Sequence, residues 1–326
     1  MIDRRDALEA RKAIGDSIRR TPLVESEFLS RFCDASVHLK LENLQITNSF
    51  KIRGALNRIL HLSEEEKRRG VITASAGNHA QAVAIATEKL DLPAKILVPR
   101  NTPQIKIDKI KKHQVELILY GDVYDEAEEK AIELARQEGL TYVSPYNDQF
   151  VIAGQGTIGL EILEDLPGVN TIIVPVGGGG LVSGIAVAVK STNPSVEVVG
   201  VQSESSPVIY ESLRAGRIVT CEMRESIAEG LHGGIEKGSM TFDIIRRHVD
   251  AVLLVREETI RKAVYLLWRQ EKQVVEGAGA AAIAPILERR NLFKGKTIVA
   301  VLSGGNIDNK LFQEILATEK ESFDLT

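Results

Sequence analysis

The feature that most constrains this chain is a regular alternation of short apolar segments with amphipathic ones, which begins near Gly70. Apolar segments typical of strands occupy 71–73, 94–98, 115–119, 141–143, 171–176 and 196–201, and segments with helical periodicity separate them. Strands that alternate with helices at this spacing predict parallel pairing through right-handed crossovers. The sequence therefore predicts an α/β protein built on parallel sheets.

The rest of the chain adds strands and helices to this pattern. Further strands are predicted at 37–41, 251–255 and 297–302, and further helices at 3–18, 207–214, 257–271, 277–290 and 308–318. The region 206–250 is otherwise irregular, with loops to about 240. At 326 residues the chain is long enough for two domains, but no linker-like composition marks a boundary.

Charge and cysteine content exclude several classes of protein. Lysine and arginine total 41 against 45 acidic residues, so no strong charge favours nucleic acid or an anionic membrane as a partner. Cys33 and Cys221 stand alone, which fits a reducing compartment rather than a disulfide framework or a zinc site. No run approaches the roughly 18 apolar residues of a membrane span. We therefore expect a cytoplasmic protein without nucleic-acid or membrane partners.

Four successive glycines follow a predicted strand and precede a predicted helix: Gly177, Gly178, Gly179 and Gly180. Backbone amides without side chains can approach an anion closely at a helix start, so a phosphate is the expected occupant. The alternative is a tight turn without a ligand. Because Ser183 stands where a dinucleotide fingerprint has its third glycine, the phosphate of a small cofactor fits better than a dinucleotide.

A lysine behind an aromatic residue, Phe50-Lys51, stands where a polar loop turns into an amphipathic helix. A lysine in an apolar pocket loses the solvation of its charge, so its pKa falls and the amine becomes a nucleophile toward aldehydes. The alternative is an ordinary solvated lysine at a helix start.

A second polar loop, Ser75-Ala76-Gly77-Asn78-His79, lies at a strand end before a helix, where sites of α/β proteins collect. Its amides could hold a substrate carboxylate, and Asn78 could donate to a phenolic or carbonyl oxygen. The alternative for Ser75 is a helix cap. His79 is expected to be a packed helix residue rather than a metal ligand.

Two further residues stand at comparable positions. Ser303 follows the last predicted strand, and its hydroxyl suits a ring nitrogen that need not be protonated, although a cap or turn is the alternative. Glu276 opens a helix of small residues and is either a buried carboxylate or a surface acid that favours a helix start.

The order of these motifs carries a resemblance. Ser-Phe-Lys-Ile-Arg-Gly-Ala at 49–55, Ser-Ala-Gly-Asn-His-Ala-Gln at 75–81, the four glycines and Ser-Gly-Gly-Asn at 303–306 resemble the fold-type II pyridoxal-phosphate enzymes. Within them the chain is most similar to the threonine/serine dehydratases and serine racemase. The resemblance implies two doubly wound open-sheet domains with the cofactor between them. It places a small domain at 70–147 and a discontinuous large domain at 1–69 and 148–326.

The resemblance also implies roles for single residues. Lys51 would hold pyridoxal 5'-phosphate as a Schiff base, with Phe50 near the ring. Asn78 would face the phenolic oxygen and Ser303 the pyridine nitrogen. The backbone would supply the remaining contacts: the phosphate would lie against Gly177, Gly178, Gly179, Gly180 and the Leu181 amide, and the substrate carboxylate against Ser75, Ala76, Gly77 and His79. Glu276 has a possible supporting role.

The implied reaction is a β-elimination that converts L-threonine or L-serine to a 2-keto acid and ammonia. The alternatives are dehydration of another β-hydroxy amino acid, such as 3-hydroxyaspartate or a hydroxyectoine-pathway compound, and serine racemisation. Racemases of this family carry a serine where this chain has Ala76, which cannot move a proton, so racemisation is disfavoured. A non-enzyme alternative is a nucleotide-binding regulatory protein that uses the glycines without catalysis.

Two expectations about ions and assembly come from the same resemblance. Some relatives bind a divalent cation through a glutamate at the position of Gln202, so a cation is doubtful here, although Glu204 is close. Family likeness implies a homodimer or a homotetramer.

Overall fold

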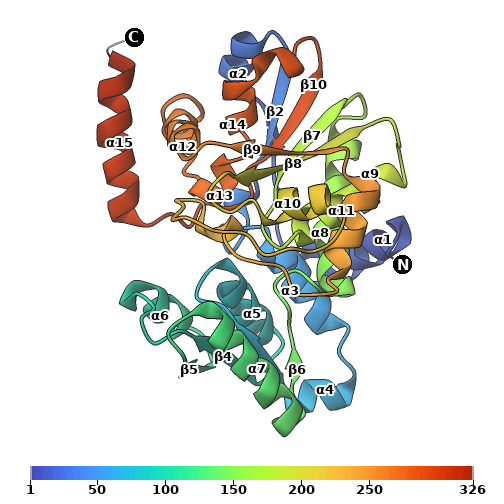
Figure 1. Ribbon diagram of the computed structural model, residues 1–326. Coiled ribbons are helices and arrows are strands. Elements are labelled where there is room, and N and C mark those ends of the chain that lie inside the picture. The colour runs from blue at the N-terminus through green and yellow to red at the C-terminus, as the bar shows by residue number, and fades with distance from the viewer. Residues whose placement is uncertain (1, 325–326) are drawn as a thin grey trace.

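The protein is built on two sheets, as the computed structural model of residues 2–324 shows (Figure 1); of residues 321–324 only the backbone is described. One sheet has six strands in the order β1-β2-β10-β7-β8-β9, and the other has four in the order β5-β4-β3-β6. All neighbouring strands are parallel except β1 and β2. The strands are β1 (Leu23–Glu25), β2 (Ser36–Lys40), β3 (Val71–Ala74), β4 (Ala94–Val98), β5 (Glu116–Leu119), β6 (Thr141–Tyr142), β7 (Thr171–Pro175), β8 (Glu197–Ser203), β9 (Ala251–Val255) and β10 (Thr297–Val301).

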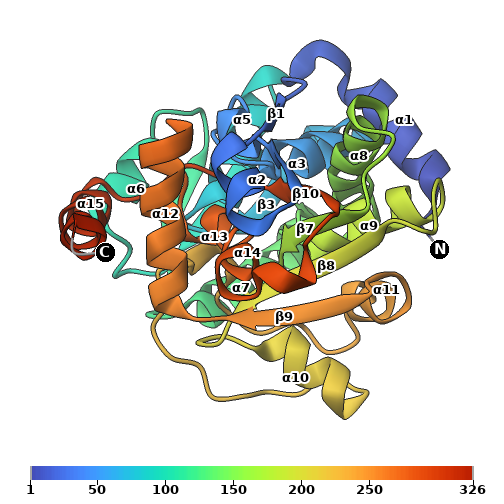
Figure 2. The ribbon, with the colours of Figure 1, turned by 90° about the horizontal axis from the view of Figure 1, so that it is seen from above.

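Helices cover the sheets and connect their strands. They are α1 (Arg4–Ile14), α2 (Glu27–Cys33), α3 (Lys51–Leu60), α4 (Glu64–Arg69), α5 (Asn78–Lys89), α6 (Gln104–Ile110), α7 (Tyr124–Glu138), α8 (Gln149–Asp165), α9 (Gly180–Lys190), α10 (Val208–Ala215), α11 (Met240–His248), α12 (Glu257–Glu271), α13 (Gly277–Ala280), α14 (Ala284–Glu288) and α15 (Asn309–Asp324). Figure 2 shows α12 and α15 side by side at one flank of the molecule, where they pack on each other. The α/β fold class predicted from the sequence is confirmed.

The centre of the larger sheet is buried on both faces. Every residue of β7 is buried, and alternate side chains enter different clusters, because successive residues of a strand point to opposite faces. Ile172 and Val174 pack with apolar residues of α8 and α9, whereas Ile173 packs with residues of α12, α13 and α14. This double cover explains why the strand is apolar throughout rather than alternating.

Helix α3 lies between the two sheets. Figure 1 shows the six-stranded sheet above and the four-stranded sheet below, with α3 at their border. The helix packs against α8 on one side and α5 on the other. Because Lys51 is its first residue, the lysine lies where the two halves meet.

The structure differs from the sequence-based expectations at several helices. The helix expected at 3–18 ends at Ile14, where a 3-10 turn follows, and the helix expected at 308–318 continues to Asp324. The predicted helix at 277–290 is wrong as a single element: α13 ends at Ala280 and α14 begins at Ala284, because Pro285 has no N–H to continue a helix from the preceding turn. Helices α11 and α2 were not predicted; α11 begins where the loops expected up to about position 240 end. Both are short and each buries only two or three side chains.

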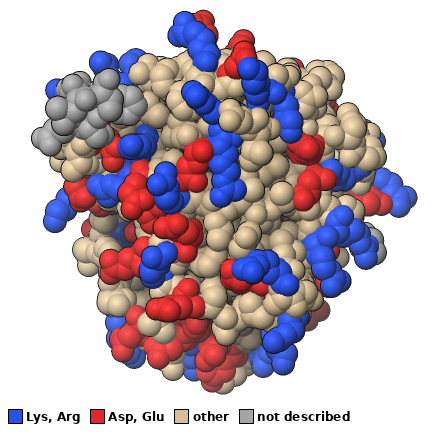
Figure 3. All heavy atoms as spheres, turned by 45° about the horizontal axis from the view of Figure 1, so that its top comes forward, with Lys and Arg blue, Asp and Glu red and all other residues tan. Residues whose placement is uncertain are grey.

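The surface shows charges of both signs. On the face drawn in Figure 3, lysines and arginines are interspersed with acidic residues rather than gathered into one field. Within residues 2–324, no helix combines the length and apolar character needed to cross a lipid bilayer.

Candidate active site between the two sheets

The loop before Lys51 is fastened to the segment after β10. Ser49 forms an isolated antiparallel bridge with Gly304. The Phe50 amide donates to the Ser303 carbonyl over 3.1 Å, and the Gly305 amide donates to the Asn48 carbonyl over 2.8 Å. These bonds join two segments some 250 positions apart in the chain and fix where α3 begins. The sequence-predicted residues Lys51 and Ser303 are therefore brought to one place.

The Lys51 amine is directed away from bulk water. Its Nζ donates to the Pro145 carbonyl over 2.8 Å and lies 5.1 Å from the centre of the Phe50 ring. Burial lowers the pKa of Lys51 to about 8, and the negative charge of Glu276 opposes that fall. Such an amine is partly uncharged near neutral pH and can attack an aldehyde.

The glycine loop, residues 177–180, presents a row of unpaired amides. Gly179 caps α9 with φ of +90°, a conformation that favours glycine. From position 177 to position 182, no backbone amide donates to an acceptor within the described part of the chain. Successive free amides at a helix start form a site for an anion, so the loop fits the phosphate that the sequence predicts.

Tyr146 and Thr241 pack closely against the glycine loop. A Cβ at Gly178 would lie 2.5 Å from the Tyr146 ring, and one at Gly180 would lie 2.9 Å from the Tyr146 backbone. Thr241 donates through its hydroxyl to the Gly178 carbonyl over 2.8 Å. The glycines are therefore required by packing as well as by the free amides.

The segment Pro145-Tyr146 connects the lysine to the glycine loop. The carbonyl of Pro145 accepts from Lys51, and the next residue packs beneath Gly178. The Lys51 amine and the glycine loop, with its free amides, therefore contact two consecutive residues, Pro145 and Tyr146. An amine and an anion site that share one neighbouring segment suit a small molecule that carries both an aldehyde and a phosphate.

The side chain of Asn78 lies among groups from the other half of the molecule. Its Nδ2 donates to Glu276 over 2.7 Å, and its Oδ1 accepts from Asn306 over 2.7 Å. Burial raises the pKa of Glu276 to about 7, and the hydrogen bond from Asn78 opposes that rise. Glu276 is thus a part-buried carboxylate of the site rather than a surface acid at a helix start.

The loop before α5 offers a second set of free amides. The Ser75 hydroxyl accepts from the Gly77 amide over 3.2 Å, and the amides of Asn78 and His79 have no acceptor within residues 2–324. A Cβ at Gly77 would meet no atom within 4 Å, so the space in front of this loop is open. A carboxylate is the kind of group that such amides bind.

The His79 side chain is turned away from this space. Its Nε2 donates to the Val143 carbonyl over 2.9 Å, and burial together with the charge of Lys51 lowers the pKa of His79 to about 3. The imidazole is therefore neutral, and the backbone of His79 is the part that faces the loop.

The Ser303 side chain is 3% exposed, and no hydrogen bond to its hydroxyl is found among residues 2–324. A buried hydroxyl without a protein partner can serve a ligand atom, either as donor or as acceptor.

Comparison with known proteins agrees with this geometry. The family profile described as pyridoxal-phosphate dependent enzyme matches residues 14–304. The chain belongs to this family. It is 47% identical to an L-threonine ammonia-lyase of Thermotoga maritima over 97% of this chain and 78% of that one. It superposes with a TM-score of 0.90 on two solved structures. One is threonine deaminase isoform 2 of Solanum lycopersicum (36% identity, 96% of this chain and 86% of that one), and the other is maize serine racemase (32% identity, 99% of each).

Membership decides between two of the sequence-based alternatives. The protein is a pyridoxal-phosphate-dependent enzyme that acts on a small amino acid, and the nucleotide-binding regulatory protein is set aside. The resemblance to fold-type II enzymes is confirmed, as is the architecture of two open sheets.

A buried ionic network behind the lysine was missed at the level of sequence. Arg53 is fully buried and donates to both oxygens of Glu42 at 2.8 and 2.9 Å and to both oxygens of Glu161 at 2.6 and 3.0 Å. Lys40 donates to Glu161 over 2.6 Å. Burial works against the charge of Arg53, but Glu42 and Glu161 outweigh it and raise its pKa. The sequence does contain a sign of this buried network, because Arg53 interrupts the apolar face of a predicted helix.

No evidence for a metal centre emerges from the described residues. They contain no group of three or more histidine, cysteine or acidic side chains that could hold a metal ion. Gln202 is engaged by the backbone, since its Oε1 accepts from the Tyr210 amide over 2.9 Å.

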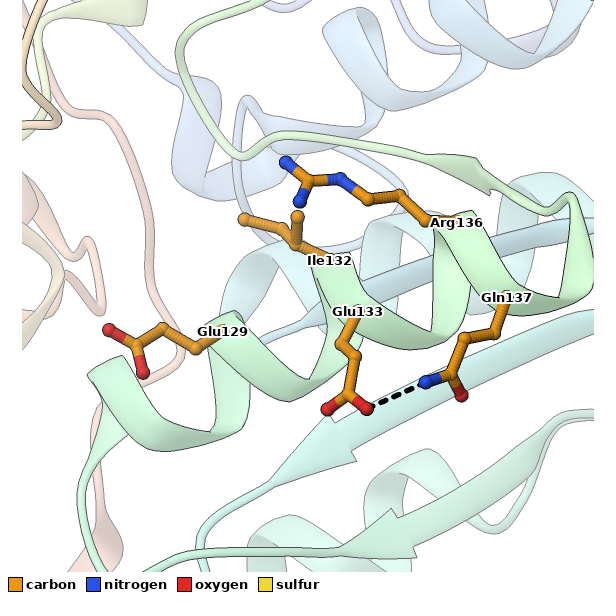
Figure 4. A pocket seen from close by; sticks show the side chains of 5 residues that line it. All are labelled: Glu129, Ile132, Glu133, Arg136 and Gln137. Carbon is orange, nitrogen blue, oxygen red and sulfur yellow. Dashed lines mark hydrogen bonds between the residues drawn. The ribbon is translucent and has the colours of Figure 1, made fainter.

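A surface hollow on α7 contains none of the predicted site residues. Figure 4 shows its lining side chains along a single helix, with Gln137 donating to Glu133 over 2.7 Å. All five lining residues belong to the outer face of α7, so the hollow offers no convergent groups from a second element.

Proposed function

We propose that this enzyme eliminates water from L-threonine, L-serine or both, with net conversion to the 2-keto acid and ammonia. One observation carries the proposal. The Lys51 amine donates to the carbonyl of Pro145, and the next residue, Tyr146, packs against the glycine loop with its free amides. The relatives named for threonine deamination support the substrate class.

The residues fit pyridoxal 5'-phosphate. Lys51 would bond to its aldehyde carbon with Phe50 beside the ring, the amides from Gly177 to Leu181 would hold the phosphate, Asn78 would donate to the phenolic oxygen, and Ser303 would meet the pyridine nitrogen. When bound, the cofactor withdraws electrons from the substrate Cα and so acidifies its proton.

The protein's own groups would then hold the substrate and move its proton. The amides of the Ser75 to His79 loop would bind the substrate carboxylate and keep the Cα–H bond in front of Lys51. Because burial lowers the pKa of Lys51 to about 8, its Nζ can take the Cα proton near neutral pH once released from the cofactor. The serine hydroxyl at position 303 would leave the ring nitrogen unprotonated, which favours rapid loss of the β-hydroxyl over a long-lived carbanion.

Ala76 favours elimination over racemisation. Racemisation needs a second proton donor on the face of Cα opposite to Lys51, and the methyl group of Ala76 has no proton to give. The structural likeness to a serine racemase therefore supports the fold and the cofactor rather than inversion at Cα.

Replacement of the lysine tests the proposal. The wild-type protein with added cofactor is expected to develop a visible band near ~410–420 nm and to release ammonia and keto acid from L-threonine or L-serine. Lys51→Ala should lose the band and the activity, whereas Lys89→Ala, at the far end of α5, should keep both. Ammonia release that persists undiminished in Lys51→Ala would refute the proposal.

A substrate panel decides among the hydroxy amino acids. Activity on 3-hydroxyaspartate or a hydroxyectoine-pathway compound that exceeds activity on both L-threonine and L-serine would replace the proposed substrates without changing the chemistry. Residues 224–241 contribute Leu231 and Thr241 next to the glycine loop and are the segment we expect to influence that preference.

We further propose that residues 70–147 form a small domain inserted in a large one at 1–69 and 148–326. Support comes from the four-stranded sheet, whose strands all lie between Val71 and Tyr142. We expect a homodimer or homotetramer, measurable by light scattering. Exposed apolar side chains around the end of α12, among them Trp268 and Val274, support a subunit contact. The cytoplasmic location stays a prediction, which cell fractionation tests.

A further inference from the structure

The orientation of the Asn78 amide follows from a chain of directional hydrogen bonds. Asn306 donates through Nδ2 to the Thr47 carbonyl over 2.9 Å and to the Oδ1 of Asn78 over 2.7 Å. A backbone carbonyl only accepts, so the atom of Asn306 that faces Thr47 is its nitrogen. The atom of Asn78 that faces this nitrogen is then its oxygen, and the Asn78 nitrogen points to Glu276.

Glu276 completes this arrangement from the opposite side. Its carboxyl group accepts from the Nδ2 of Asn78 over 2.7 Å, which is the direction that the contacts of Asn306 require. The Asn306 backbone amide also opposes the rise in the pKa of Glu276, so Asn306 acts on both Asn78 and Glu276. No second acceptor for the Nδ2 of Asn78 is found in the described part of the chain, which leaves its other hydrogen for a ligand.

The backbone around Glu276 is shaped to admit its carboxylate. The Glu276 amide donates to the Gly304 carbonyl over 3.0 Å. A Cβ at Gly304 would lie 2.4 Å from the Glu276 oxygen and 3.3 Å from the Nδ2 of Asn78. The glycine after Ser303 therefore makes room for the contact between Glu276 and Asn78.

We propose that Glu276 and Asn306 are positioning residues that fix the Asn78 amide with its free N–H directed at the phenolic oxygen of the cofactor. This inference rests on the proposed function, since it assigns Asn78 to that oxygen. In the opposite orientation, Asn78 would present an acceptor to an oxygen that also accepts, and the two would repel each other. Neither positioning residue needs to touch the cofactor.

Isosteric variants separate positioning from simple packing. Asn306→Asp replaces the donor by an acceptor and opposes the Oδ1 of Asn78, so the affinity for pyridoxal phosphate should fall by at least about tenfold, with a lower visible band at saturation. Glu276→Ala should do the same because it removes the acceptor. Glu276→Gln should stay within about threefold of wild type, because its amide oxygen accepts the same N–H.

Asn43→Asp is the matched control. Asn43 is buried, and its Nδ2 donates to the Val274 carbonyl over 3.3 Å and to Gln273 over 3.0 Å, without a hydrogen bond to Asn78. It undergoes the same chemical change and loses a comparable bond. We expect it to lower thermal stability while the affinity for the cofactor and the shape of its band are unchanged.

The measurements are cofactor titration followed by visible absorption, and thermal unfolding of the apoprotein. Asn306→Asp or Glu276→Ala with wild-type affinity and band would overturn the positioning role, as would an equal loss in Asn43→Asp. Should Asn306→Asp fail to fold, Glu276→Ala against Glu276→Gln decides alone. A wild-type protein that never develops the band would overturn the proposed function and this inference together.

Discussion

The buried network around Arg53 gives a prediction whose size follows from the structure. Lys40 and Arg53 face Glu42 and Glu161, so the charges of the four buried or nearly buried side chains cancel. Arg53→Met keeps much of the side-chain volume but leaves Glu42 without a cationic partner. The cluster then carries a net negative charge in a site without water access.

Removal of one partner from a buried ion pair destabilises a protein by about 3–5 kcal/mol. With roughly 2 °C per kcal/mol for a chain of this size, the thermal midpoint of Arg53→Met should fall by about 6–10 °C. Arg11 offers a matched control, because its ion pair with Glu164 is exposed by 39% and 46%. Arg11→Met should change the free energy of unfolding by less than about 1 kcal/mol.

The pH dependence of the stability of Arg53→Met tests whether an unpaired buried charge causes its loss of stability. In the wild type, burial favours the neutral form of Glu161, but Arg53 and Lys40 together outweigh burial and lower the pKa of Glu161. Without Arg53, protonation of a carboxylate removes the unpaired charge from the native state. The folded variant then binds more protons than the wild type, so its deficit should shrink as the pH falls from about 7 to about 5.

A second substitution tests the same reasoning by rescue. Glu42→Gln in the Arg53→Met background removes the unpaired charge and leaves the pair of Lys40 and Glu161. We expect recovery of more than half of the lost stability, measured by urea and thermal unfolding of the apoprotein. A single variant within about 1 kcal/mol of wild type at pH 7, or a double variant without any recovery, would contradict the account.

Three further predictions concern the site. Gly178→Ala places a methyl group against the Tyr146 ring and should weaken pyridoxal-phosphate binding by at least about tenfold. Gly168→Ala, whose methyl group would meet no atom within 4 Å, should leave that affinity unchanged. Equal titration curves for the two variants would contradict the packing argument. Ala76→Ser should gain measurable serine racemisation by chiral chromatography, while wild type shows little; comparable rates of inversion and elimination in wild type would reverse this assignment. Because burial lowers the pKa of Lys51 to about 8, the rate at which the apoprotein captures the cofactor should rise with pH and level off above about pH 8. A stopped-flow rate that still rises near pH 10.5, the ordinary pKa of a lysine, would contradict this prediction.

Much of the fold could be predicted because its strands are apolar and regularly spaced. Every strand predicted between 37 and 302 is present within a residue or two of its expected bounds. The errors fall where periodicity is a weak guide. In the short helix α11 the apolar spacing of Phe242 and Ile245 extends over only one turn. At 277–290 the small residues suggested one helix, but α13 ends at Ala280 and Pro285 lies in the first turn of a separate helix, α14.

The candidate site could be predicted only in part. The motifs around Lys51, Asn78 and Ser303 identify groups that suit a cofactor, and the structure brings them together. The contact of Glu276 with Asn78 joins positions almost 200 residues apart. No local pattern reports such a contact, since it depends on how the two sheets lie against each other.

The place of β10 in its sheet has a consequence for the order in which the molecule is completed. This strand follows the other nine along the sequence, and it pairs with β2 on one side and β7 on the other, while β2 and β7 do not pair with each other directly. A nascent chain in which β10 has not yet been synthesised already contains every strand of the four-stranded sheet. Its Ser49, however, lacks Gly304 as the partner for the antiparallel bridge. We therefore expect the bridge that fixes the start of α3 beside Lys51 to form only after residues 297–304 have been synthesised.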